Sequence, residues 1–88
     1  MDKEKIRKEL YALLVVRFLI EEDELNDGSA NICTDLGLDS LDVVELVEHF
    51  EEKYKISIPD DVTADVGNMT IDQVVDFVYE ATTKYKKS

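Results

Sequence analysis

The length and composition of the chain limit what it can be. Its 88 residues suit one domain over 1–88, too small to enclose a deep, water-excluded active site, and 44% hydrophobic content excludes a disordered tail. The formal net charge of −11 argues against nucleic acid and favours basic protein partners, and the single Cys33 excludes a disulfide framework. We expect a monomer of the reducing cytoplasm whose chemistry is supplied by partner proteins.

The start of the chain predicts one amphipathic helix. From Lys3 to about Ile20, apolar residues recur with the four-three spacing of a single helical face. The residues on this face are Ile6, Leu10, Leu13, Leu14 and Phe18. The most apolar stretch is interrupted by Arg17 and falls well short of the roughly 20 residues that span a bilayer, so we expect no membrane insertion.

Residues 21–39 are expected to form a long loop. They show no sustained periodicity, and Asp27-Gly28 is a dipeptide typical of turns. Leu25, Ile32 and Leu36 are the apolar residues expected to anchor this loop. So long a loop in so small a domain is usually functional.

A sharply two-sided helix is predicted to begin at Ser40. At 100° per residue, the buried side comprises Val43, Leu46, Val47, Phe50 and Tyr54. The opposite side carries Glu45, Glu48 and Glu52, in line with Leu41. From Phe18 to Glu52 the chain holds twelve of its 21 acidic residues and no Lys or Arg, so this helix lies in the most acidic part of the sequence.

Two more helices complete the predicted elements. Pro59 suits the first turn of a short helix that runs to about Val66. Thr70 and Gln73 form a capping box before a last amphipathic helix. We therefore expect an all-α fold, a small up-down four-helix bundle of three longer helices and one short helix, with a long first loop.

The most informative segment is the junction between the long loop and the second helix. It reads Asp35-Leu36-Gly37-Leu38-Asp39-Ser40-Leu41-Asp42 and continues as Val43-Val44-Glu45-Leu46-Val47, with Ile58-Pro59-Asp60 downstream. Together with the helix order, this run closely resembles the acyl carrier protein family over nearly the whole chain. The resemblance implies a carrier and not an enzyme, which presents acyl intermediates of fatty-acid, polyketide or related lipid biosynthesis as thioesters.

The resemblance further implies that Ser40 carries 4'-phosphopantetheine, transferred from coenzyme A by a phosphopantetheinyl transferase. The residue types suit this role, because the first turn of a helix offers backbone N–H donors to a phosphate. Asp39 and Leu41 flank the attachment site. Asp39 is also a good N-cap residue, a capping hydroxyl is the ordinary role of a serine at a helix start, and Gly37 supplies either an unusual backbone conformation or an ordinary turn.

The acidic side of the second helix is expected to contact basic patches on acyl-loading and acyl-processing enzymes. The residues assigned to this face are Asp42, Val44, Glu45, Glu48 and Glu52. A run of acids is often simply a solvated face. The exposed Leu41 beside the attachment site favours a partner contact instead.

Nucleophilic catalysis by Ser40 is disfavoured by the position of the only histidine. His49 lies nine residues along the same helix, about 13 Å away and on the opposite side, so no direct dyad forms. Cys33 is expected to be a small buried hydrophobic residue.

A calcium site is disfavoured by the spacing of the loop acids. Asp23, Asp27 and Gly28 match three positions of an EF-hand loop, but Leu25 and Thr34 stand where ligands are needed. We expect no dedicated metal site.

Three features depart from the family pattern. Glu48 stands where an apolar residue such as Met is common, Ala64 stands where an acid is common, and Gly67-Asn68 resembles a two-residue insertion. These departures leave the attachment chemistry intact and leave the identity of the partners open, between general fatty-acid synthesis and a specialised pathway. Two alternatives stay open: a carrier of aminoacyl or D-alanyl cargo, and an unmodified acidic helical adaptor that binds a basic partner.

Overall fold

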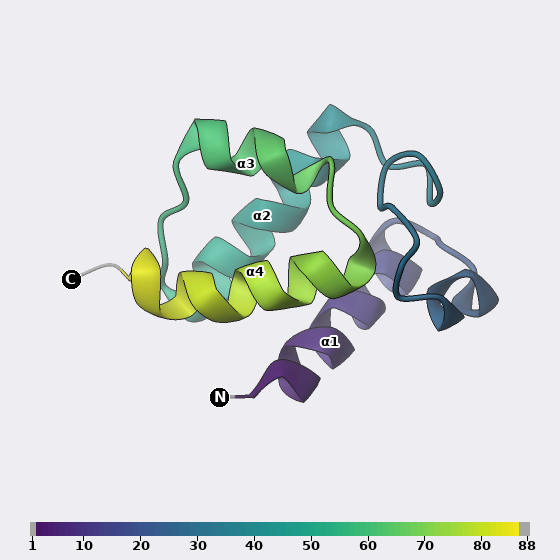
Figure 1. Cartoon of the computed structure of the whole chain (residues 1–88), viewed down its shortest axis with the longest axis horizontal. Coiled ribbons are helices and arrows are strands. Elements are labelled where there is room, and N and C mark those ends of the chain that lie inside the picture. Colours follow the sequence, from purple (N-terminus) through teal and green to yellow (C-terminus); the bar gives the residue numbers. More distant parts are fainter. Residues whose placement is uncertain (1, 87–88) are drawn as a thin grey trace.

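The computed structural model describes residues 2–86 and contains four α-helices (Figure 1). They are α1 (Lys3–Ala12), α2 (Ser40–Tyr54), α3 (Asp60–Val66) and α4 (Ile71–Lys84). Within residues 2–86 there is no regular strand, only isolated bridges that pair Asn31 with Thr70 and Ile56 with Lys86. The expected all-α fold of three longer helices and one short helix is confirmed.

The core lies where α1, α2 and α4 meet. The side chains that are fully buried there include Ile6, Leu10, Leu46, Phe50, Ile71, Val74, Val75 and Val78. Figure 1 shows α3 and α4 running in opposite directions, with the long connection between α1 and α2 gathered at one end of the bundle. Each fully buried aliphatic or aromatic side chain contributes about 1.5–3 kcal/mol, so this cluster is the main source of stability.

The predicted buried stripe of α2 is confirmed in four of its five residues. Val43, Leu46, Val47 and Phe50 are buried, and Tyr54 is half-buried with its ring stacked on Phe50. The predicted capping box of α4 is also present.

The short third helix begins one residue later than the sequence suggested. Pro59 is the N-cap of α3 and not part of its first turn. Its fixed φ of −59° and extended ψ of 149° direct the chain into the helix, and Val62 and Thr63 donate backbone hydrogen bonds to the Pro59 carbonyl.

The prediction that the first helix reaches about Ile20 is wrong. Regular α-helix ends at Ala12, and a π-helical turn, η1 (Leu13–Arg17), follows it. Leu19 then takes a left-handed φ of 59°, and the Ile20 N–H bonds back to the Leu14 carbonyl at 2.9 Å. The apolar periodicity continued past the helix because Phe18 and Ile20 still pack on the core from a turn.

The segment predicted as a long loop contains a short 3-10 helix, η2 (Glu22–Asn26). A capping box between Glu21 and Glu24 starts it. The three anchoring residues are buried as expected: Leu25, Ile32 and Leu36. Backbone hydrogen bonds tie the middle of the segment to the start of α4: the Gly28 and Ala30 carbonyls accept N–H groups of that helix, and the Ile32 N–H bonds the Met69 carbonyl.

Candidate functional site

Ser40 is the first residue of α2, and its side chain is exposed. Asp39 is the N-cap: its Oδ1 accepts the Asp42 N–H at 2.9 Å, while Asp42 Oδ2 accepts the Asp39 N–H at 3.2 Å. The capping role expected of Asp39 is therefore confirmed. Because this box uses only those two donors, the N–H groups of Ser40 and Leu41 are left at the positive end of the helix dipole.

The loop before α2 holds Ser40 at the surface through one glycine and two anchors. Gly37 has a φ of +86°, and a Cβ there would meet no atom within 4 Å, so the backbone angle alone requires glycine. The Gly37 N–H bonds the Cys33 carbonyl at 2.9 Å, and Leu36 and Leu38 on either side are buried. This arrangement turns the chain sharply and places the exposed Ser40 hydroxyl at the start of α2.

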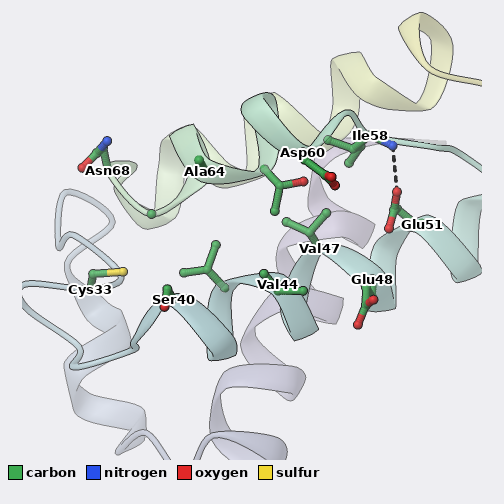
Figure 2. Close-up of a pocket in the computed structure, with 13 residues that line it drawn as sticks. Cys33, Ser40, Val44, Val47, Glu48, Glu51, Ile58, Asp60, Ala64 and Asn68 are labelled. Atoms are coloured by element: carbon green, nitrogen blue, oxygen red, sulfur yellow. Dashed lines mark hydrogen bonds between the residues drawn. The ribbon is translucent and has the colours of Figure 1, made fainter.

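A cavity of about 560 Å³ lies between α2 and α3 and extends from Ser40 (Figure 2). The side chains from α2 that line it are those of Ser40, Val43, Val44, Val47, Glu48 and Glu51. From the segment around α3 come Ile58, Asp60, Thr63, Ala64, Gly67 and Asn68. Its volume falls within the range of about 300–1,000 Å³ typical of small-molecule sites. No feature of the sequence pattern indicated this cavity, because it depends on how α3 packs against α2.

Cys33 lines the same cavity and is half-buried, so it is less enclosed than the sequence suggested. Burial raises the pKa of its thiol, and the carboxylates of Asp39 and Asp42 raise it further. The thiol is therefore protonated near neutral pH and is a weak nucleophile.

The acidic side of α2 is exposed, but its residues are not equivalent. Leu41 is 77% exposed, and Val44 is 43% exposed. Glu48 and Glu52 are exposed, whereas Glu45 is half-buried and its Oε2 lies 2.6 Å from Arg17 Nε. Sequence reasoning missed this ion pair, since it joins residues 28 positions apart and Arg17 stood out only as an interruption of the apolar stretch.

The structure keeps His49 away from Ser40, as the helical spacing predicted. His49 Nε2 lies 2.9 Å from Glu9 Oε1 on α1. Among residues 2–86, no three His, Cys, Asp or Glu side chains are grouped so as to hold a metal ion. In that same part of the chain, none of the helices has the length and apolar character needed to cross a bilayer.

Comparison with known proteins decides the family. A family model described as a phosphopantetheine attachment site matches residues 8–78. The chain is 35% identical over 78 residues to an acyl carrier protein of Guillardia theta, covering 89% of this chain and 93% of that protein. It is 32% identical to an acyl carrier protein of Chlorobium luteolum, covering 89% and 96% respectively. The chain belongs to the acyl carrier protein family. The resemblance and the expectation of a non-catalytic carrier are thereby confirmed.

The residues at the start of α2 suit phosphopantetheine, the cofactor of this family. They offer an exposed hydroxyl, a helix N-terminus with unused backbone donors and an adjoining cavity. When attached, the cofactor supplies a thiol at the end of a flexible arm, on which acyl groups are held as thioesters.

Proposed function

We propose that Ser40 is the residue that carries the phosphopantetheine arm, and that the chain presents acyl intermediates of fatty-acid, polyketide or related lipid biosynthesis to partner enzymes. The observation that supports this proposal is the exposed Ser40 hydroxyl at a helix start, beside a cavity large enough for small-molecule cargo. The family match over residues 8–78 includes this serine.

In this proposal Ser40 Oγ attacks the phosphorus atom of coenzyme A that bears the pantetheine, and the nucleotide portion departs. In this proposal a base of the transferase accepts the hydroxyl proton. The carboxylates of Asp39 and Asp42 are held by backbone N–H groups, and His49 faces Glu9. The carrier itself supplies the nucleophile and its position.

The test is the intact mass of variants after incubation with coenzyme A and a phosphopantetheinyl transferase. Ser40→Ala should fold normally and gain no mass, whereas the exposed control Ser57→Ala should gain the arm as the wild type does. A mass gain in Ser40→Ala would show that another residue is modified. A wild-type chain that is never modified would favour the unmodified adaptor.

We further propose that the exposed face of α2 docks on basic patches of the transferase and of the acyl-loading and acyl-processing enzymes. This docking face is supported by its charge and by the exposed Leu41 and Val44. Glu48 and Glu52 are its best test residues, because Glu45 is already paired with Arg17 and a reversal there would also break a contact within the chain.

Charge-reversal variants distinguish an effect of the docking face from an effect of the net charge of the protein. Glu48→Lys/Glu52→Lys should slow arm transfer and acyl loading more than Glu4→Lys/Glu80→Lys, a control of equal charge change at exposed positions on α1 and α4. One exposed ion pair is worth only about 0.2–1 kcal/mol, so a double reversal is needed. The loss should appear in the association rate and shrink as salt is added.

Two outcomes bear on this docking proposal. Equal losses in the two double variants would mean that net charge matters and the docking face does not. Leu41→Ala should weaken the complex with little change in its salt dependence, because it removes apolar contact only.

A further inference from the structure

The cavity beside Ser40 ends in a polar wall (Figure 2). α2 and α3 run in opposite directions along it, so that Ser40 and Asn68 lie at one end and Glu51 and Ile58 at the other. The side chains between the two ends are mainly apolar: Val43, Val44, Val47 and Ala64. The cavity is therefore an apolar passage with a carboxylate at its far end.

The carboxylate of Glu51 is fixed in place by the opposite side of the cavity. Its Oε2 accepts the Ile58 N–H at 2.7 Å, a short charge-assisted hydrogen bond. Glu51 is half-buried and Ile58 is 6% exposed. Glu48 and Asp60 also line this end, but both are exposed and can turn into water. Glu51 alone is held across the gap between α2 and the segment that leads into α3.

The position of Glu51 sets a distance from the attachment residue. Ser40 and Glu51 are eleven residues apart on one helix, which corresponds to about 16 Å. An apolar chain that enters beside Ser40 gains burial along the valines and Ala64. To pass Glu51 it would have to displace the Ile58 hydrogen bond or strip water from the carboxylate, and both cost free energy.

From this arrangement we infer that Glu51 limits the length of the acyl chain that the carrier can shelter, and so acts as a specificity-determining residue. The inference rests on the proposed function, because it needs an arm on Ser40. Acyl chains that end before Glu51 are sheltered completely. Longer chains leave part of their length in water.

The test compares the melting temperatures of the protein loaded with butyryl, octanoyl, dodecanoyl and hexadecanoyl groups. The reference is the same protein carrying the unacylated arm, with every loading verified by intact mass. In the wild type, the gain in melting temperature should rise with chain length and then level off. Glu51→Leu should move this plateau to longer chains, because it removes the hydrogen bond and replaces the carboxylate with an apolar wall.

Two matched variants identify the cause of the plateau. Glu51→Gln keeps a carbonyl acceptor for the Ile58 N–H and should level off where the wild type does. Glu80→Leu removes the same charge at an exposed position on α4 that does not line the cavity, and it should also keep the wild-type plateau.

Hydrogen exchange of the Ile58 amide tests the inference in the unmutated protein. The amide should stay protected with every acyl group, since none passes the Glu51 hydrogen bond. Loss of this protection with the hexadecanoyl group would overturn the inference. So would the absence of a plateau in the wild type, an unchanged plateau in Glu51→Leu, or a shifted plateau in Glu80→Leu. A protein that never accepts the arm would instead contradict the assignment of Ser40.

Discussion

Helices α2 and α4 begin with the same local chemistry and serve different purposes. Each starts with a capping box, Asp39 with Asp42 in one and Thr70 with Gln73 in the other. After the cap, α4 continues with Ile71, which is fully buried, whereas α2 continues with the exposed Ser40 and then Leu41. A capping box thus marks where a helix begins, and the side chains that follow it indicate whether that end is structural or available for function.

The backbone donors at the two helix starts differ in the same way. The N–H groups of Ile71 and Asp72 bond the carbonyls of Ala30 and Gly28, both at 3.0 Å, so the long loop closes the start of α4. Within residues 2–86, no protein carbonyl takes the N–H groups of Ser40 or Leu41. The loop therefore satisfies the backbone donors at the start of α4 and leaves those at the start of α2 available to a phosphate.

The largest expected effect comes from truncating an apolar residue at each helix start. Ile71→Ala should lower the free energy of unfolding by about 2–5 kcal/mol, because it leaves a cavity in the core. Leu41→Ala should change it by less than about 0.5 kcal/mol, since that side chain is already in water. Urea denaturation of both variants measures the difference. Similar losses would show that Leu41 is part of the core.

The capping residues should give equal stability effects and unequal functional effects. Thr70→Ala and Asp39→Ala should each cost about 1 kcal/mol, because each removes the acceptor of the third helical N–H. Only Asp39→Ala should also slow arm transfer at Ser40, measured by mass spectrometry over time. If Asp39→Ala instead raised the melting temperature, repulsion among the acids would outweigh capping.

The smallest expected effect on stability concerns the ion pairs that join α1 to α2 and α4. Lys3 and Arg7 pair with acids of α4, while Glu9 contacts His49 at 2.9 Å and Lys53 at 3.3 Å on α2. The hydrogen bond from His49, with a further contribution from Lys53, lowers the pKa of Glu9 below its ordinary value of 4.5. The α1–α2 contact should therefore weaken in acid.

The direction of this pH dependence follows from the lowered pKa of Glu9. Glu9 stabilises the fold while it is ionised, and this contribution is lost as the pH falls through its folded-state pKa. The difference in stability between wild type and Glu9→Gln should be at most about 1 kcal/mol near neutral pH and should shrink in acid. Glu80→Gln, an exposed control on α4, should show a smaller pH dependence. A difference that stays constant from neutral pH into acid would contradict the assignment.

Much of the fold could be predicted because its signals are local. Helical periodicity, the capping residues Asp39 and Thr70, and the left-handed Gly37 all act within a few positions of the chain. The end of α1 could not be predicted from local spacing, because Phe18 and Ile20 keep the apolar pattern of a helix while they pack on the core from a turn.

The candidate site could be predicted only in part, for a related reason. Ser40 lies in a recognisable motif, whereas the pairing of Arg17 with Glu45 depends on how η1 packs against α2. The hydrogen bond between Glu51 and Ile58 likewise depends on the approach of α3. Contacts between residues that are far apart in the sequence leave no signal in the local spacing of residue types.

The half-buried Cys33 bears on how safely a thioester can be carried. The cavity next to Ser40 contains this thiol, and a thiol beside a thioester is a competing acceptor for the acyl group. Exchange of an acyl group between sulfur atoms needs a thiolate, and the raised pKa keeps Cys33 in its protonated form. Burial, helped by the acids at the start of α2, thus disfavours transfer of the cargo from the arm to the Cys33 thiol.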